Sequence, residues 1–236
     1  MADWDEIARD FDESFFKDPM YARILASVVE GARGAAVERA LDLGCGTGNL
    51  IALLLEEFPS AGFSGVDPST GMREVCAERF VDYPNVEIKE GDAQAIPYPD
   101  SSFDLIVSSL ALHHVPPERK PDMAREIARV LEPGGRFIHA DPFCGVPGDF
   151  ADPEKVRDVV ERLVAKALYS LDHGAWEMML GELQSIPFLL RGDGEYIITV
   201  EEWEAVLREA GFDGFEVQAL PPVDLVKVIS CRLNGT

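Results

Sequence analysis

A glycine-rich loop near residue 45 is the first feature of this 236-residue chain that could bind a small ligand. The loop Gly44-Cys45-Gly46-Thr47-Gly48 follows the short apolar run 39–43, which carries Asp42, and precedes an apolar segment with helical character. Glycine at positions 44 and 46 lets the backbone turn tightly and approach a ligand with no Cβ in the way. The unpaired N–H groups at the start of the following helix could then bind a carboxylate or a phosphate.

The position of the third glycine distinguishes two classes of ligand. The dinucleotide-binding fingerprint Gly-x-Gly-x-x-Gly would place a glycine at position 49, where this chain has Asn49. Its third glycine is instead Gly48, which packs the helix differently and leaves less room for a pyrophosphate. A nicotinamide-dependent oxidoreductase therefore stays open only as the weaker alternative.

Two aspartates end the next two expected strands. Asp67 closes the run 62–66, about 20 residues beyond the loop, where an acid can accept hydrogen bonds from both hydroxyls of a ribose. A helix-capping role for Asp67 is less favoured because Ser69 can provide the cap. Asp92 follows the run 86–89 and could accept a hydrogen bond from an adenine amine, although aspartate is also common in turns. Together with the loop, these acids indicate a nucleoside site.

Two adjacent histidines, His113 and His114, follow the apolar run 103–109, which we expect to be the fourth strand. Histidine titrates near neutral pH, so either ring could remove a proton from a bound acceptor. Such a base is needed only when the reacting atom carries a proton of high pKa, as a hydroxyl or a carbon acid does. A purely structural role for both histidines is the other interpretation.

The elements that would position these residues alternate regularly from residue 39 onward. Short apolar runs separated by helical segments indicate a parallel sheet with helices on both faces. The expected strands are 39–43, 62–66, 86–89, 103–109 and 136–140, and the expected helices are 49–57, 69–80 and 121–131. The sequence Pro133-Gly134-Gly135 would end the last of these helices. Residues 1–35 are expected to be helical, with a break at Pro19.

The alternation stops after Asp141, where we expect a helical insertion. Residues 142–152 are rich in Pro and Gly, and residues 153–190 have helical character without a strand. A helix over 199–210, with a capping box formed by Thr199 and Glu202, then precedes two closing strands. These strands, 215–219 and 225–231, are too close for a crossover helix, so the last one is expected to be antiparallel.

The chain is therefore predicted to be one domain, 1–236, built from four segments. These are an N-terminal helical segment (1–35), a ligand-binding core (36–141), a helical insertion that would cover the acceptor (142–195), and a helix with two closing strands (196–236).

The composition argues against several classes of function. Lys and Arg number 21 against 43 Asp and Glu, a net charge of −22 with no basic run to offset it, so nucleic acid is a poor partner. No apolar run approaches the ~18 residues of a membrane span, and the acidic N-terminus does not resemble a signal peptide. The four cysteines are scattered, so no metal site or disulfide framework is expected. We expect a cytoplasmic monomer or homodimer.

With these motifs, the chain resembles the class I S-adenosylmethionine-dependent methyltransferases. Within them it looks most similar to the small-molecule branch of the ubiquinone and menaquinone biosynthesis methyltransferases, which carry a type 11 methyltransferase domain. The matching stretches are 41–49, 65–69, 91–93, 103–108, 112–115 and 131–135. The resemblance is strong over 36–141, rests on pattern alone over 196–231, and does not extend to 142–195.

The resemblance implies a Rossmann-like, doubly wound, seven-stranded sheet that is mostly parallel, with an antiparallel last strand. It implies S-adenosylmethionine as cofactor and S-adenosylhomocysteine as product. By position in the motifs, Asp42, Gly44, Cys45 and Gly46 would surround the methionine part, Asp67 and the adjacent Pro68 the ribose, Asp92 and Ala93 the adenine, and backbone near Ser108 the amino group.

The acceptor would be a small molecule bound under the insertion. Phe11 is a candidate wall for the sulfonium, because aromatic faces attract cations, although it could simply pack in the core. Tyr169, His173 and Trp176 are candidates for contact with the acceptor. The sequence Val115-Pro116-Pro117-Glu118 lacks the flanks of the tetrad that marks nucleobase-amine methylation. A non-catalytic adaptor that keeps the cofactor pocket is the remaining alternative.

Overall fold

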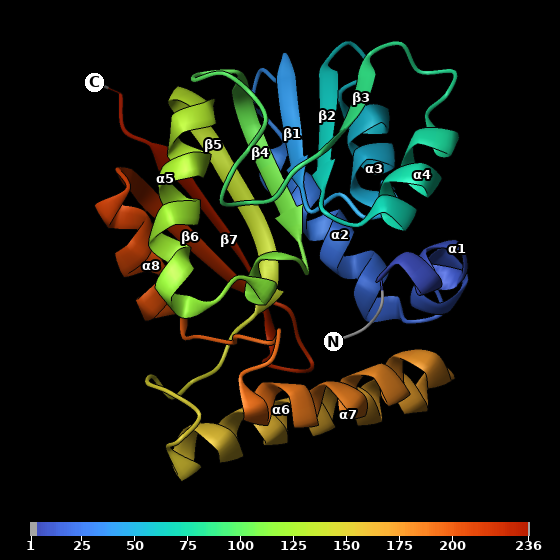
Figure 1. Cartoon of the computed structure of the whole chain (residues 1–236), viewed down its shortest axis with the longest axis vertical. Coiled ribbons are helices and arrows are strands. Elements are labelled where there is room, and N and C mark those ends of the chain that lie inside the picture. The colour runs from blue at the N-terminus through green and yellow to red at the C-terminus, as the bar shows by residue number, and fades with distance from the viewer. Residues whose placement is uncertain (1–3, 236) are drawn as a thin grey trace.

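The computed structural model describes residues 4–235, without the side chains of Glu6, Ile7, Asp10, Glu13 and Ser14. Its centre is a seven-stranded sheet in the order β3-β2-β1-β4-β5-β7-β6 (Figure 1). The strands are β1 (Arg39–Leu43), β2 (Gly62–Asp67), β3 (Val86–Glu90), β4 (Phe103–Ser109), β5 (Leu131–Pro142), β6 (Phe212–Ala219) and β7 (Val226–Leu233). Strands β1 to β5 are parallel and β7 is antiparallel to both β5 and β6, which confirms the predicted doubly wound sheet.

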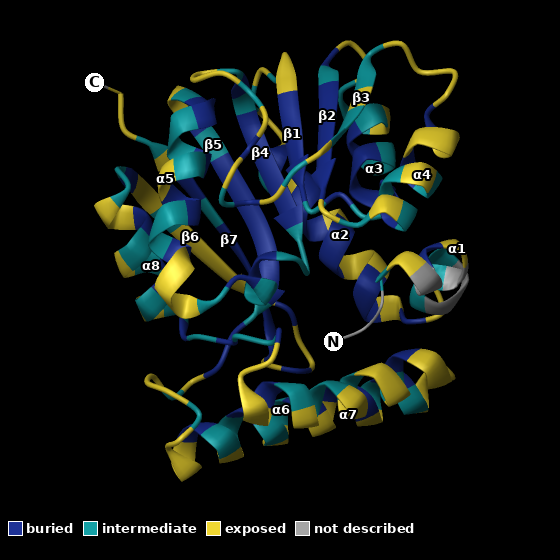
Figure 2. Ribbon diagram, in the orientation of Figure 1, coloured by how far each residue is buried: buried dark blue, intermediate teal, exposed yellow. Residues whose placement is uncertain are grey.

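Helices cover both faces of the sheet, and each face has its own hydrophobic core. The helices are α1 (Trp4–Phe15), α2 (Pro19–Ala32), α3 (Asn49–Glu57), α4 (Thr70–Arg79), α5 (Lys120–Val130), α6 (Pro153–Asp172), α7 (Trp176–Arg191) and α8 (Val200–Glu209). One core packs α2, α3 and α4 on the sheet, and the other packs α5 and α8. Figure 2 shows the inner strands β1, β2, β4 and β5 as largely buried, whereas most residues of the edge strand β6 are exposed. In residues 4–235, no helix combines the length and hydropathy needed to cross a membrane.

Local signals explain where the helices begin. The Asp18 side chain caps α2 and Pro19 takes its first position, as expected from the predicted break there. Ser69 accepts a hydrogen bond from the Met72 N–H and so caps α4. Both bonds of the Thr199 and Glu202 capping box are present at α8. These caps set the ends of the loops that carry the site.

The largest error in the predicted boundaries lies between α5 and β5, and β6 also begins at Phe212 rather than at residue 215. The helix expected over 121–131 ends at Val130, and the strand expected at 136–140 already begins at Leu131. Leu131 is buried and pairs with Phe103 of β4, so burial favours the strand over a further helical residue. The register then jumps to Arg136 opposite Leu105, and Pro133-Gly134-Gly135 forms the irregularity inside β5 rather than a helix end.

The insertion after β5 is helical, as predicted. Helices α6 and α7 pack side by side across the carboxyl ends of the parallel strands, and α1 lies at the same edge of the sheet (Figure 1). In doubly wound sheets, ligands bind outside this edge, where the strand order reverses between β1 and β4. The fold therefore places a covered space at its expected binding position.

Candidate active site

A cavity of about 910 Å³ lies at this edge, between the loops that follow the strands and helices α1 and α7. Ten residues predicted for the site line it: Phe11, Gly44, Cys45, Gly46, Asp67, Pro68, Asp92, Ala93, His113 and His114. The candidate cofactor loop and the two histidines thus share one continuous space. Two further predicted residues, Asp42 and Ser108, do not line it, nor do the three predicted for the acceptor.

Glycine is required at positions 44 and 46 for different structural reasons. Gly44 and Gly46 both adopt positive φ, +77° and +52°, which side chains disfavour. A Cβ at Gly44 would lie 2.4 Å from the Cβ of Ala111, so this glycine makes room for the loop after β4 rather than for a ligand. At Gly46 the nearest heavy atom would be the Met72 sulfur at 4.0 Å, so it is this glycine that leaves the cavity open.

Asp67 holds the rim of the cavity together. Its carboxylate accepts one hydrogen bond from the Gly46 N–H at 2.9 Å and another from the Ser69 N–H at 2.9 Å. Burial raises the pKa of Asp67, and these two bonds and the charge of Arg73 partly oppose that rise. Because Ser69 itself caps α4, the capping role for Asp67 is not needed. The carboxylate lines the cavity as the end of β2.

Asp42 lies beneath the loop rather than in the cavity wall. It is 3% exposed, and neither carboxylate oxygen has a hydrogen-bond partner within the described part of the chain. Burial, and then the charge of Asp67, raise the pKa of Asp42 to about 8. A buried acceptor without a donor is costly, and a cationic group at the loop would relieve that cost. Asp42 therefore fits a ligand that carries an ammonium.

The side chain of Ser108 points away from the cavity, whereas the prediction concerned the backbone near it. Its hydroxyl is buried and donates to the Leu43 carbonyl at 2.6 Å, which ties β4 to the end of β1. The next two residues, Ser109 and Leu110, line the cavity in its place. The chain near Ser108 therefore lies at the cavity, and contact of its backbone with the amino group stays a prediction.

Asp92 forms a turn and also lies in the wall of the cavity. Its carboxylate accepts a hydrogen bond from the Gln94 N–H at 2.7 Å, the geometry of an aspartate turn. Asp92 and Ala93 also line the cavity. The turn therefore fixes the side chain at the wall, and the structural role does not exclude contact with a ligand.

Asn49 has a structural function that the sequence analysis missed. Its amide N–H donates to Asp12 of α1 at 2.7 Å and to the Tyr21 hydroxyl of α2 at 3.2 Å. Its amide oxygen accepts from Arg79 of α4 at 2.6 Å, and Arg79 also pairs with Asp12. Asn49 therefore joins three helices to the glycine loop. The residue that distinguishes this loop from a dinucleotide fingerprint is the one that docks α1 over it.

Replacing Asn49 with Ala should lower the free energy of unfolding by about 1–3 kcal/mol, because it leaves buried partners unsatisfied. Loss of the Asp12 bond should also raise the hydrogen-exchange rate of α1 amides. Chemical denaturation and exchange mass spectrometry measure both effects. Asn85→Ala is the matched control, since Asn85 donates a single hydrogen bond, to Ala61, away from the cavity. Unchanged α1 exchange in Asn49→Ala would contradict the docking role.

His113 is the histidine that has a carboxylate partner. Its Nδ1 lies 2.7 Å from Oδ1 of Asp141 near the end of β5, which favours a proton on Nδ1, and its Nε2 lies 3.4 Å from Oε2 of Glu195. Burial lowers the pKa of His113, but the charge and hydrogen bond of Asp141, together with the charge of Glu195, outweigh burial and hold it above its ordinary value. The pair has the geometry of a general base with an orienting acid.

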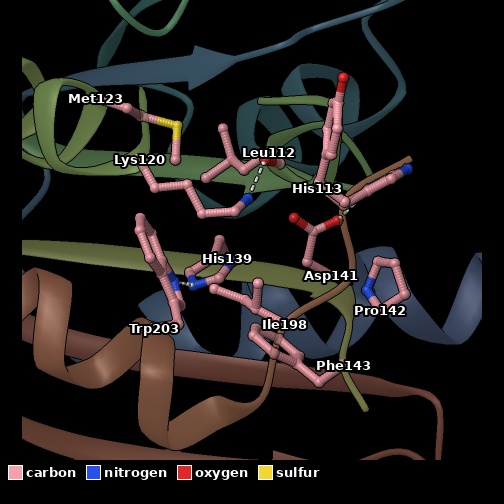
Figure 3. A pocket seen from close by; sticks show the side chains of 11 residues that line it. Leu112, His113, Lys120, Met123, His139, Asp141, Pro142, Phe143, Ile198 and Trp203 are labelled. Carbon is pink, nitrogen blue, oxygen red and sulfur yellow. Dashed lines mark hydrogen bonds and ion pairs between the residues drawn. The ribbon is translucent and has the colours of Figure 1, made fainter. Parts of the chain in front are cut away.

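The carboxylate of Asp141 is itself held in a buried polar cluster behind the cavity (Figure 3). Lys120, only 4% exposed, donates to the Leu112 carbonyl at 3.0 Å. Burial raises the pKa of Asp141, but the charge and hydrogen bond of His113, and then the charges of His139 and Lys120, hold it below its ordinary value. The Trp203 indole donates to His139 at 2.7 Å next to it. Asp141 therefore stays ionised although it is buried. Sequence analysis missed it, although it ends a strand as Asp67 and Asp92 do.

His114 has a different environment. Its Nδ1 lies 2.7 Å from the Gly194 carbonyl, and its ring packs edge-on against Trp4. Burial, and then the charge of His113, lower the pKa of His114 to about 3, so the ring is neutral across the physiological range. It shapes the wall and is a weak base.

The two histidines also approach Glu195 closely enough to be considered as metal ligands. One ligand atom from each of the three residues lies within 4.8 Å of the others. Both Nδ1 atoms already bind an oxygen, that of Asp141 or of Gly194, which leaves only the two Nε2 atoms. The scattered cysteines and histidines of the sequence gave no sign of this grouping, because residue 195 is far from 113 along the chain.

The residues predicted to contact the acceptor lie elsewhere. Trp176 is 58% exposed, His173 is also exposed, and Tyr169 stacks on the His173 ring away from the cavity. Helix α7 presents another face to the cavity, with Met178, Glu182, Ser185 and Phe188. The prediction chose polar aromatic residues by type, whereas the helical period decides which face is turned inward.

The fold and the cavity define the class of this protein. Strand order 3-2-1-4-5-7-6 with an antiparallel seventh strand, and a glycine loop with an acid after each of the next two strands, are those of a class I methyltransferase. Residues 40–135 match a sequence family described as a methyltransferase domain. The chain is 32% identical over 170 residues to an uncharacterized methyltransferase of Geobacillus kaustophilus, covering 71% of this chain and 72% of that one. The chain belongs to this methyltransferase family.

The chain is also similar to a second sequence relative and to a solved structure. The chain is 31% identical over 185 residues to 27-O-demethylrifamycin SV methyltransferase of Amycolatopsis mediterranei, covering 75% of this chain and 55% of that one. Its fold is similar to human N-acetylserotonin methyltransferase in complex with S-adenosylmethionine, with a TM-score of 0.62 and 19% identity over 90% of this chain and 52% of that one.

Proposed function

We propose that this protein uses S-adenosylmethionine to methylate a hydroxyl group of a small molecule and releases S-adenosylhomocysteine. The observation that carries the proposal is the single cavity that joins the glycine loop and Asp67 to the buried pair of His113 and Asp141. One end of this space suits a nucleoside, and the other holds a base. The 27-O-methyltransferase relative supports a hydroxyl as the reacting group.

The residues of the loop end fit the parts of the cofactor. Gly46 leaves room for the methionine part, and the unpaired carboxylate of Asp42 suits its ammonium group. Asp67 would accept hydrogen bonds from the ribose hydroxyls, and Asp92 from the adenine amine. Phe11, stacked on Phe15 with a ring separation of 3.8 Å, provides an aromatic wall for the sulfonium.

For methyl transfer, the protein mainly has to orient the acceptor and remove the proton of its hydroxyl. The cofactor supplies an electrophilic methyl group whose leaving group is a neutral thioether, so no anion needs stabilisation there. Positioning the acceptor can contribute roughly 7–11 kcal/mol to the lowering of the barrier. Nε2 of His113 would accept the hydroxyl proton, and Asp141 would stabilise the imidazolium that forms.

The alternatives have less support. A non-catalytic adaptor would keep a cofactor cavity but would not need a buried carboxylate to orient a histidine toward it. An oxidoreductase is disfavoured by Asn49, whose bonds to three helices occupy the position of the third fingerprint glycine. The closer resemblance to quinone-biosynthesis methyltransferases stays a prediction, as does the expectation of a monomer or homodimer.

Calorimetric titration of the purified protein with S-adenosylmethionine, S-adenosylhomocysteine and NAD tests the first part of the proposal. Both methionine-derived ligands should bind with micromolar or tighter affinity, and NAD should give no heat. Thermal unfolding should shift upward with the two binders alone. Binding of NAD, or absence of binding by both methionine-derived ligands to well-folded protein, would overturn the assignment.

A further inference from the structure

The acceptor end of the cavity is acidic. Three glutamates line it: Glu177 and Glu182 on α7, and Glu195 between α7 and α8. Glu177 pairs with Lys17 at 3.6 Å, which leaves Glu182 and Glu195 to be considered. Among the residues that the structure describes, no lysine or arginine lines this cavity. Anionic acceptors, such as carboxylic acids and phosphate esters, would therefore meet mainly negative charge there.

The charge of Glu182 is only partly compensated. Lys166 lies 3.7 Å from it but forms its closer ion pair with Asp18, which is fully buried at the start of α2. The same ammonium donates to the Ser170 hydroxyl at 2.9 Å. One cation therefore serves two carboxylates, and the one that faces the cavity is the more distant. Burial raises the pKa of Glu182, and the charges of Asp18 and Glu195 raise it further against the opposing effect of Lys166.

Glu195 has a similar deficit. Its carboxylate lies 3.4 Å from Nε2 of His113, whose other nitrogen already binds Asp141. A neutral His113 is required for it to act as a base, and it then brings no positive charge to either carboxylate. Glu182 and Glu195, whose side chains are 18% and 19% exposed, thus have only a shared lysine and a neutral imidazole as their neighbours. Burial of unpaired charge is unfavourable, so a cationic ligand would stabilise this site.

We propose that the acceptor carries a protonated amine, which binds between Glu182 and Glu195 while the reacting hydroxyl faces His113. The proposal rests on the methyltransferase function proposed above and names its substrate class. The aromatic residues Trp4, Phe15 and Phe188 also line the cavity and suit both the apolar body of such a molecule and its positive charge. The acceptor is thus a hydroxylated organic amine rather than an acid or a phosphate ester.

A matched acceptor panel tests this proposal. The panel uses phenolic, alicyclic and sugar-like skeletons that all carry a hydroxyl. Each skeleton is prepared in three forms, which carry an amine, a neutral amide or a carboxylate at one fixed position. Formation of S-adenosylhomocysteine and calorimetric binding to the complex with that product are measured for every member. Amines should bind at least 10-fold more tightly than their neutral partners, and carboxylates should not bind. A panel in which amines show no preference, or no binding at all, would overturn the proposal.

Variants test whether the carboxylates of Glu182 and Glu195 cause the preference for amines. Glu182→Gln and Glu195→Gln should each weaken amine binding by 10-fold or more while the affinity for S-adenosylhomocysteine stays unchanged. Two separate variants guard against a folding defect in either one. Glu161→Gln is the control, because this carboxylate lies on the solvent side of α6 beside Arg157. Retention of the amine preference in both cavity variants would refute the role of these carboxylates, whereas loss of cofactor binding in the unmodified protein would refute the methyltransferase function itself.

Discussion

Replacing His113 with Gln should reduce turnover by about 10²–10⁴-fold, the range that general-base catalysis contributes, without weakening cofactor binding. Glutamine keeps a polar side chain of similar length but cannot take up the proton. The rate is measured as formation of S-adenosylhomocysteine with the acceptor that the panel identifies, and cofactor affinity by calorimetry. His114→Gln is the control, since its pKa of about 3 makes it a weak base, and its rate should change much less.

The pH dependence provides a second readout for the same residue. Because Asp141 and Glu195 hold the pKa of His113 above its ordinary value, the ring becomes protonated and inactive as the pH falls through that raised value. The acid limb of the rate profile should therefore lie above pH ~6.5, the ordinary histidine pKa. Asp141→Asn removes the carboxylate that raises the pKa and should move this limb to lower pH while reducing the rate (Figure 3).

A metal-dependent reaction would contradict this mechanism. His113, His114 and Glu195 have the mutual spacing of metal ligands, so the assay includes treatment with a chelator. We expect full activity after chelation. Loss of activity that a divalent cation restores would assign these residues to a metal centre instead of a general base.

Replacing Asp67 with Ala should weaken cofactor binding by about 100-fold or more. Each hydrogen bond to a charged acceptor contributes about 1.5–3 kcal/mol, and the ribose would lose two. The Gly46 and Ser69 N–H groups would also lose their acceptor, so the rim should loosen. Calorimetry with S-adenosylhomocysteine measures the loss, and a melting curve reports the folding of the variant.

The control for this variant is Asp82→Ala, which removes an exposed acid between α4 and β3. It should bind the cofactor as the unmodified protein does. If a folded Asp67→Ala variant bound S-adenosylhomocysteine with unchanged affinity, the ribose role of Asp67 would be wrong, and the acid would serve only to shape the turn.

The sequence predicts the sheet and the cofactor end well because their signals are local. Strands β1 and β4 and helix α3 begin and end where predicted, since each is a short apolar run bounded by turn residues. The acids at the ends of β2 and β3 were found by the same rule. Applied to the fifth strand, the rule would also have found Asp141. Asp141 was not predicted because it lies directly before the point where the alternation of strands and helices stops.

The acceptor end could not be predicted in the same way. Which face of α7 turns inward depends on how it packs against α6 and across the sheet, so Glu182 could not be distinguished from other acids of a very acidic chain. Glu195 lies in the loop between α7 and α8, whose path along the cavity depends on the same packing. The reason for glycine at position 44 likewise depends on tertiary packing and could not be predicted from the sequence. The motif places a glycine there, but only the packed structure shows that Ala111, and not a ligand, requires it.

The docking of α1 has a consequence for the catalytic cycle. Asp5 accepts hydrogen bonds from the Ser69 hydroxyl and the Gly71 N–H, and Asp12 binds Thr47 and Asn49, so both ends of this helix are fastened beside the nucleoside end of the cavity. We expect release of spent cofactor to require that some of these bonds break, because α1 residues Trp4, Phe11 and Phe15 line the cavity. Product exchange is then coupled to a helix moving as a unit, and the residence time of S-adenosylhomocysteine would depend on side chains that never touch the acceptor.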